Sequence, residues 1–379
     1  MRRKKICFIV TIPEIVHAFL KKHIEALSSD YDVYLVGDIK SQDNIEGLSL
    51  KGFLDVKISR KISLLNDLKA VWILYRYFKV MNFDAVHSAM PKAGLLTALA
   101  GFGAKVSNRI HIFTGQVWAT KTGPMRIILK LADKFICSLD NYILVDGKSQ
   151  RDFLVGEGVL KEKKGIVFGE GSICGVDVDR FNPSGLIRQA EREKYHISDD
   201  SFVYVFLGRL NHDKGTFDLL KAFNRLAFNK DDVFLFLAGA DEEKCLDRLD
   251  EYPNVKLGEN LFYMGYVKDP ERYLQIGDVF CLPSYREGFG SSIIEAACLG
   301  IPSICSDVYG LREAIIDNKT GLRCKVGDAD SLYNCMVSYY EDRKLAQQHG
   351  FAARERVLTE FQGKDITKSW VDFYHQIMS

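Results

Sequence analysis

Two carboxylates, Glu287 and Glu295, stand eight positions apart, and the small-residue segment Gly288-Phe289-Gly290-Ser291-Ser292 lies between them. The apolar run Asp278–Pro283 before them reads as a buried strand, and the residues after Ser291 read as a helix. The first N–H groups of a helix have no partner inside it, so a junction of strand, glycine loop and helix binds phosphate. Because phosphate repels carboxylates, we expect both glutamates to bind hydroxyl groups of a sugar nucleotide instead.

Two cations occupy a second loop of the same kind. Arg209 and Lys214 lie in Gly208-Arg-Leu-Asn-His-Asp-Lys-Gly215, directly after the apolar run Phe202–Gly208. Arginine offers a planar fork to phosphate oxygens and lysine a point charge. This pair suits a reaction that expels a nucleoside diphosphate, because the charge that develops on the leaving group must be stabilised. The alternative is a pair of solvated surface cations at a turn.

These motifs resemble the family 4 retaining glycosyltransferases. The two glutamates lie in the pattern P-S-x-x-E-G-F-G-x-x-x-x-E-A, residues 208–215 match G-R-x-x-x-x-K-G, and residues 306–313 match S-D-x-x-G-x-x-E. The resemblance covers most of the chain and is sharpest from 208 to 321. It implies the α/β GT-B fold, in which two Rossmann-like, doubly wound domains face each other across a cleft.

The resemblance also implies roles for individual residues. Glu295 would accept hydrogen bonds from the ribose and Glu287 from the transferred sugar, while Arg209 and Lys214 stabilise the diphosphate. The backbone near Tyr263–Val267 would contact the base. The donor-binding residues implied in this way are Gly208, Tyr266, Val267, Gly288, Phe289, Gly290, Ser291, Glu295 and Gly310.

The first half of the chain carries candidates for the acceptor side. Many family members have His-Gly in the loop where this chain has Thr114-Gly115, and the nearest histidine, His111, lies three positions before Thr114. Both residues are therefore candidates for the catalytic contact, although His111 could equally be a buried strand histidine. The form F-T-G-Q-V-W resembles the subgroup that extends undecaprenyl-diphosphate-linked oligosaccharides. Further acceptor-side candidates are His87, Lys92, Gln116 and Trp118.

Length and periodicity predict two domains. The chain has 379 residues, more than one typical domain, and apolar strands alternate with helical segments in both halves, which is typical of parallel sheets. We expect an acceptor domain at 1–183, a polar linker at 182–197, a nucleotide-sugar domain at 198–362 and a C-terminal helix at 363–379. In the GT-B fold that helix crosses back to the first domain; the alternative is that it packs on its own domain. The expected strands are Lys5–Thr11, Asp32–Gly37, Ala85–Ser88, Arg109–Phe113, Tyr142–Val145, Gly165–Phe168, Phe202–Gly208, Val233–Ala238, Leu261–Gly265, Asp278–Pro283, Pro302–Ser306 and Gly321–Cys324.

Composition excludes several classes of function. A net charge of +1 gives no field that favours nucleic acid. Nine cysteines without a C-x-x-C pair indicate a reducing, cytoplasmic compartment. No uncharged run reaches the ~18 residues of a spanning helix. No G-x-G-x-x-G follows the first strand, which argues against a dinucleotide-dependent oxidoreductase. We expect no metal and no other cofactor, because no ligand cluster is visible.

One segment predicts a membrane contact. Lys121, Arg126, Lys130 and Lys134 flank apolar residues at helical spacing, a pattern that suits an anionic membrane surface. The alternative is a core-facing helix with a solvated basic face. We therefore expect the protein to be peripheral on the inner face of the cytoplasmic membrane.

Together these observations predict a retaining hexosyltransferase. It would move a sugar, GalNAc or GlcNAc, from a UDP-sugar to a lipid-diphosphate-linked saccharide of bacterial O-antigen, capsule or other glycan biosynthesis. A nucleotide-sugar epimerase, or a non-catalytic nucleotide-sugar binding protein on the same fold, remains the alternative.

Overall fold

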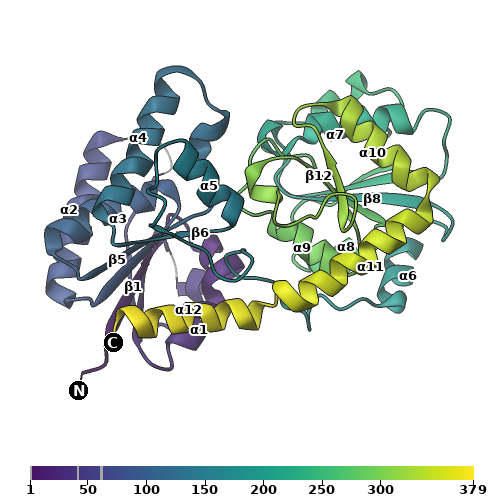
Figure 1. Cartoon of the computed structure of the whole chain (residues 1–379). Coiled ribbons are helices and arrows are strands. Elements are labelled where there is room, and N and C mark those ends of the chain that lie inside the picture. The colour runs from purple at the N-terminus through teal and green to yellow at the C-terminus, as the bar shows by residue number, and fades with distance from the viewer. Residues whose placement is uncertain (1, 41, 60–62) are drawn as a thin grey trace. The chain divides into compact units, whose positions relative to one another are not determined.

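The computed structural model describes residues 2–40, 42–59 and 63–379, which divide into two compact units (Figure 1). The first unit comprises residues 1–174 and 364–379, and the second comprises residues 175–363. The first unit is therefore discontinuous in sequence, whereas the second is a single uninterrupted stretch. None of the helices in the described ranges is long and apolar enough to span a bilayer.

The described part of the first unit is built on one seven-stranded parallel sheet with the order β3-β2-β1-β4-β5-β6-β7. Its inner strands are buried on both faces, as expected for a parallel sheet covered by helices. The strands are β1 (Lys5–Ile9), β2 (Asp32–Gly37), β3 (Gly52–Asp55), β4 (Ala85–Ala89), β5 (Asn108–Phe113), β6 (Tyr142–Val145) and β7 (Gly165–Ile166).

Helices cover both faces of this sheet. The helices are α1 (Lys21–Leu27), α2 (Leu64–Met81), α3 (Pro91–Ala104), α4 (Gly123–Leu139), α5 (Lys148–Gly156) and α12 (Gly363–Ile377). One apolar cluster joins the sheet to α2 and α3, and another joins its opposite face to α1 and α12. The C-terminal helix α12 inserts Trp370 and Tyr374, both fully buried, next to the ring of Phe8. The last residues of the chain thus complete the core of the first unit.

The second unit contains, among its described residues, a six-stranded parallel sheet with the order β10-β9-β8-β11-β12-β13. Its strands are β8 (Phe202–Leu207), β9 (Val233–Ala238), β10 (Leu261–Tyr263), β11 (Val279–Leu282), β12 (Ser303–Ser306) and β13 (Gly321–Cys324). Its helices are α6 (Gly185–Glu193), α7 (Thr216–Leu226), α8 (Pro270–Leu274), α9 (Ser291–Cys298), α10 (Ala329–Glu341) and α11 (Arg343–Glu360). The strand order reverses between β8 and β11, and ligands of such sheets bind at the carboxyl ends of the strands at this switch point.

The expected strands agree with the observed ones to within one or two residues at most ends, and two expectations were wrong. Strand β3, at the edge of the first sheet, was not predicted. Residues 182–197 are not a linker, because they contain α6 and belong to the second unit, which begins at Gly175. The charges that made this segment look solvated are partly buried: Arg188 and Arg192 hold the two carboxylate oxygens of Asp278 at 2.6 and 2.7 Å.

Candidate active site

Four loops meet at the carboxyl edge of the second sheet, and glycines allow their close approach. A Cβ atom on Gly239 would lie 1.8 Å from the carbonyl oxygen of Gly208, one on Gly215 would lie 2.0 Å from that of Pro283, and one on Gly310 would lie 2.1 Å from that of Glu287. Gly239 and Gly215 also have φ of +134° and +72°, which glycine adopts without strain. The loops after β8, β9, β11 and β12 therefore form one continuous edge.

An ion pair crosses the switch point of this sheet. The Lys214 ammonium lies 2.5 Å from Oε1 of Glu287, and the Ser284 hydroxyl donates to the same oxygen at 2.8 Å. The pair is mostly buried, with side-chain exposures of 21% and 12%. Asn211 caps the turn that ends at Lys214 by accepting from its backbone N–H at 3.0 Å. The structure thus brings together one predicted cation from the β8 loop and one predicted carboxylate from the β11 loop.

The second predicted cation lies on the same loop. Arg209 donates from Nη1 to both carboxylate oxygens of Glu242, at 3.1 and 2.9 Å, and Asn211 donates to Glu242 at 2.7 Å. Arg209 is about half exposed, so solvent or a ligand can reach its guanidinium. In this structure each predicted phosphate-binding cation is held by a carboxylate at the strand edge.

A second ion pair, which the sequence did not reveal, joins the same two loops as the first. The Arg286 guanidinium donates to Oδ2 of Asp213 at 2.8 and 3.0 Å, and the backbone N–H of Tyr285 donates to the Asp213 carbonyl at 2.9 Å. Asp213 and Arg286 each precede a member of the Lys214–Glu287 pair in the sequence. Neighbouring residues therefore tie the same two loops together twice. In the sequence, Asp213 and Arg286 are only two opposite charges within two recognised motifs, and nothing there indicates that they are in contact.

The N-terminus of α9 completes the glycine loop. Gly290 stands at its N-cap with φ of +74°, and no described side chain caps the helix. Ser291 and Ser292 are partly exposed, whereas Phe289 is buried and packs on Phe361 at a ring distance of 5.4 Å. The free end of α9 therefore offers N–H groups to an anion.

Glu295 lies one turn inside α9, and its carboxyl group makes no hydrogen bond to another described residue. Burial raises the pKa of Glu295 to about 7, while the charge of Arg180 lowers it and that of Glu271 raises it. Arg180 and Glu271 pair with each other at 2.7 Å. Glu295 is thus a largely desolvated carboxyl group that can accept hydrogen bonds from a ligand.

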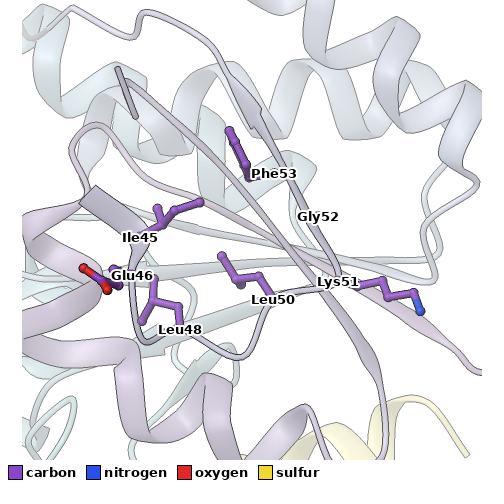
Figure 2. A pocket seen from close by; sticks show the side chains of 7 residues that line it. All are labelled: Ile45, Glu46, Leu48, Leu50, Lys51, Gly52 and Phe53. Atoms are coloured by element: carbon purple, nitrogen blue, oxygen red, sulfur yellow. The ribbon is translucent and has the colours of Figure 1, made fainter. Parts of the chain in front are cut away.

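The predicted base-contact segment follows β10. The backbone N–H of Gly239 donates to the carbonyl of Gly265 at 2.7 Å, which links this segment to the β9 loop. Tyr266 is 83% exposed, and Val267 lines a pocket of about 340 Å³ next to α6 and α8. A second pocket, of about 500 Å³, lies in the first unit and is lined by residues 45–53 (Figure 2). That lining mixes apolar side chains with the charged Glu46 and Lys51, and it contains none of the predicted site residues.

Both predicted histidines of the first unit lie in its core. His87 bonds through Nδ1 to the Tyr374 hydroxyl at 2.7 Å and stacks on Trp370, and burial lowers its pKa. His111 bonds through Nδ1 to the Ser88 hydroxyl at 2.9 Å, and burial lowers its pKa to about 3. A Cβ atom on Gly94 would lie 2.4 Å from the His111 ring, so α3 packs directly over it. Both rings are therefore neutral hydrogen-bonding groups inside the sheet layers.

The remaining acceptor-side candidates occupy different environments. Trp118 is buried and donates its indole N–H to Asp133 at 2.7 Å, and Lys92 pairs with Asp67 at 2.5 Å. Gln116 is buried in the loop after β5, and Thr114 in the same loop is partly exposed. Thr114 and Gln116 thus share the carboxyl edge of the first sheet, whereas His87 and His111 lie within strands. Their roles remain predictions.

No group of three or more His, Cys, Asp or Glu side chains in residues 2–40, 42–59 and 63–379 could hold a metal ion. The metal independence of the reaction remains a prediction.

Comparison with known proteins agrees with the family resemblance of the second unit and with the expected fold. A family model described as "Glycosyl transferases group 1" matches residues 187–356. The chain is 28% identical over 385 residues to the capsular polysaccharide biosynthesis glycosyltransferase CapM of Staphylococcus aureus, covering all of this chain and 98% of that protein. It is 26% identical over 302 residues to the UDP-Gal:alpha-D-GlcNAc-diphosphoundecaprenol alpha-1,3-galactosyltransferase of Escherichia coli, covering 78% and 76%.

A solved structure shares the whole fold. Anabaena HepE in complex with UDP and glucose superposes with a TM-score of 0.82 at 16% identity, covering 98% of this chain and all of that chain. This chain therefore has the two-unit parallel-sheet fold of that structure, and over residues 187–356 it resembles the glycosyl transferases of group 1.

Proposed function

We propose that this glycosyltransferase moves GalNAc or GlcNAc from a UDP-sugar to a lipid-diphosphate-linked saccharide, with retention of the anomeric configuration, in capsule or O-antigen biosynthesis. The observation that carries the proposal is the Lys214–Glu287 pair at the switch point of the group 1 domain, next to the uncapped N-terminus of α9. The names of the two relatives support the pathway and the lipid-linked acceptor, because one acts in capsule biosynthesis and the other on a diphosphoundecaprenol substrate.

The proposed chemistry assigns different tasks to the charged groups. Arg209 and Lys214 stabilise the diphosphate as its bond to the sugar breaks, which is where preorganised charge lowers the barrier most. The departing phosphate takes the proton of the attacking hydroxyl on the same face of the sugar. Glu287 orients the transferred sugar and Glu295 the ribose, and the free N–H groups of α9 bind phosphate oxygens. The reaction needs no metal under this scheme, because the two cations neutralise the leaving group.

We also propose that the first unit binds the inner face of the cytoplasmic membrane through α4. Ile127, Ile128, Leu131 and Phe135 are 44–60% exposed on this helix. Lys121 and Lys134 are exposed at its flanks, whereas Arg126 and Lys130 pair with Glu157 at 2.9 and 2.6 Å. The surface is therefore more apolar and less cationic than the sequence indicated, and its exposed Lys121 and Lys134 suit anionic lipid.

Helix α2 extends this apolar surface. Leu65, Leu68 and Trp72 are 57–83% exposed along one stripe of α2, and the guanidinium of Arg76 lies 5.0 Å from the Trp72 ring. Figure 1 shows α2, α3 and α4 in one helical layer of the first unit. Large exposed apolar side chains on one layer mark an interaction surface. The Trp72 indole, with Arg76 beside it, suits the interface of a bilayer.

The activity is tested by release of UDP. A panel of UDP-sugars is incubated with an undecaprenyl-diphosphate-linked saccharide, and the product is analysed for anomeric configuration. We expect release that requires both a UDP-HexNAc donor and the lipid-linked acceptor, with an α-linked product. Conversion of the donor into another nucleotide-sugar without acceptor would identify an epimerase instead, and binding without any turnover would identify a non-catalytic binder.

Membrane contact is tested by cosedimentation with vesicles. We expect binding to phosphatidylglycerol vesicles and not to phosphatidylcholine vesicles, and we expect Ile127→Glu with Leu131→Glu to abolish it. Phe351→Glu is the matched control, because Phe351 is 69% exposed on α11 of the second unit. Equal binding of the α4 variant and the control would contradict this surface.

A further inference from the structure

Asp146 lies directly after the sixth strand of the first sheet, a position typical of ligand-binding residues. It directly follows β6, and the loop with Thr114 and Gln116 directly follows the parallel neighbour β5. The carboxyl ends of adjacent parallel strands form one edge, and ligands of doubly wound sheets bind there. Asp146 therefore stands at the same edge of the first unit as the predicted acceptor loop.

The burial of its carboxyl group has no structural explanation. Asp146 is 3% exposed, and its Oδ1 atom has no hydrogen-bond partner among the residues that the structure describes. Helix α5 begins two residues later, yet no described side chain caps it. Burial raises the pKa of Asp146 to about 8. A buried polar group without a partner destabilises the fold, so such groups concentrate at functional sites.

The surroundings of Asp146 supply further hydrogen-bonding groups. The side-chain oxygen of Gln150 accepts from the backbone N–H of Asp146 at 2.7 Å. The amide nitrogen of Gln150 lies 3.4 Å from the carbonyl of Phe113 and 3.5 Å from Oε1 of Gln116. These contacts fix the backbone of Asp146 against the β5 loop, while Oδ1 of its carboxyl group has no partner among the described residues. Carboxyl and amide groups held in this way are suited to the hydroxyl groups of a saccharide.

We propose that Asp146 binds a hydroxyl group of the saccharide acceptor and orients it for attack. This inference rests on the proposed function, because it takes the acceptor to bind the first unit. Gln150 holds the backbone of Asp146 at the strand edge, and the acceptor hydroxyl provides the partner that Oδ1 lacks among the described residues. Asp146 is an acceptor-binding residue in this scheme and does not contact UDP.

The test separates acceptor binding from donor binding. Asp146→Ala should raise the acceptor KM about tenfold or more, the effect of one lost hydrogen bond to a buried polar group. The affinity for UDP, measured by titration calorimetry, should stay within about twofold. Asp146→Asn keeps the shape and a neutral hydrogen-bonding group, so it should recover most of the acceptor affinity that Asp146→Ala loses. Asp146→Ser serves as the second variant if Asp146→Ala does not fold.

The same strand offers a matched control. Asp140 lies near the opposite end of β6, is equally buried, and has neither carboxylate oxygen hydrogen-bonded within the described ranges. If a buried aspartate only affected folding, Asp140→Ala and Asp146→Ala would change the melting temperature alike and leave the acceptor KM unchanged. We expect only the Asp146 variants to change the acceptor KM.

An acceptor KM within about twofold of wild type in Asp146→Ala and Asp146→Ser would overturn the inference. So would a parallel loss of UDP affinity, which would place Asp146 on the donor side. These outcomes are read in a wild-type protein that transfers sugar. A wild-type protein that releases no UDP from any donor would instead contradict the proposed function.

Discussion

Lys214 and Glu287 form an ion pair of 2.5 Å, although they lie on loops that follow different strands of the second sheet. The carboxylate that the family resemblance assigns to the transferred sugar is thus in contact with the cation assigned to the diphosphate. A donor that binds here must share Lys214 with Glu287. If the two residues have these proposed roles, one ion pair couples the positioning of the sugar to the stabilisation of the leaving group.

Removal of either cation is expected to slow turnover. Lys214→Ala and Arg209→Ala should each lower kcat by about 10²-fold, because preorganised positive charge at the developing diphosphate is lost. Steady-state release of UDP measures the effect, and circular dichroism checks that the fold is intact. Arg225→Ala is the control, since Arg225 is an exposed helical cation paired with Asp330 at 2.9 Å. Wild-type turnover in both site variants would remove these residues from the mechanism.

Glu287 is expected to affect sugar transfer, and Glu295 is expected to affect nucleotide binding. Glu287→Gln should reduce transfer strongly and change UDP affinity little. Glu295→Gln should weaken UDP about tenfold, the effect of an imperfect partner for a ribose hydroxyl in a largely desolvated position. Titration of UDP into both variants decides the matter. The reverse pattern would exchange the two roles.

Binding of UDP is expected to release a proton at mildly acidic pH. The pKa of Glu295 is about 7 in the ligand-free protein, so the group is largely protonated at pH 6. Ribose hydroxyls that donate to the ionised carboxylate would lower this pKa, and the proton must then leave. Calorimetry at pH 6 in buffers of different ionisation enthalpy measures the release. Glu295→Gln should abolish it, and an unchanged release in that variant would assign the proton to another group.

The same raised pKa predicts how Glu295 affects stability. Its folded pKa exceeds the ordinary value of 4.5, so its stabilising contribution is present below about pH 4.5 and is lost as pH rises through about 7. The melting temperature of Glu295→Gln minus that of wild type should therefore rise from pH 4.5 to 7 and level off above it. Titration of the buried histidines is common to both proteins and cancels in the difference. A flat difference would contradict the burial of an ionisable Glu295.

Arg286 and Asp213 are expected to act as one unit that positions Lys214. Breaking their ion pair with Arg286→Ala or Asp213→Ala should lower kcat, because the β8 and β11 loops lose one of the two ion pairs described between them. The double variant should cost no more than the larger single effect, since residues in contact are not additive. Steady-state kinetics of the wild type, the two single variants and the double variant complete this double-mutant cycle. Additive losses would show that each residue acts separately.

Activity is expected to survive EDTA. Lys214 and Arg209 both lie at the carboxyl edge of the second sheet. Under the proposed function they neutralise the diphosphate there without a divalent ion. Turnover is measured after dialysis against EDTA and again after addition of Mg²⁺ or Mn²⁺. Loss with EDTA and recovery with either metal would show that the leaving group is stabilised by an ion instead.

Local patterns predicted most of the architecture, because runs such as Asp32–Gly37 and Val233–Ala238 are apolar, short and buried on both faces. The exception was α6, where Arg188 and Arg192 look solvated in sequence but bind Asp278, a residue more than eighty positions away. Pairing at such a distance leaves no local signal. The edge strand β3 was also missed. Its residues are only partly buried, and it forms by pairing with β2, which its own sequence does not show.

The candidate site was predicted unevenly. Motif spacing located Lys214, Glu287 and the α9 N-terminus, because a glycine loop between strand and helix has a local sequence signature. It could not show that Lys214 contacts Glu287 or that Arg286 contacts Asp213, since these contacts depend on strand order. Asp146 was missed because a lone aspartate after a strand has no motif. Its interest comes from burial without a partner, which only the structure reveals.

Helix α12 has a consequence for how the protein is made. Translation finishes residues 175–363 before it reaches Trp370 and Tyr374, so the second unit is complete while the first still lacks part of its core. The half of the chain that leaves the ribosome first is therefore the half that can finish folding last. Until α12 arrives, the apolar surface around Phe8 stays open to chaperones and proteases. The persistence of the first unit in the cell thus depends on a segment that is translated after the whole second unit.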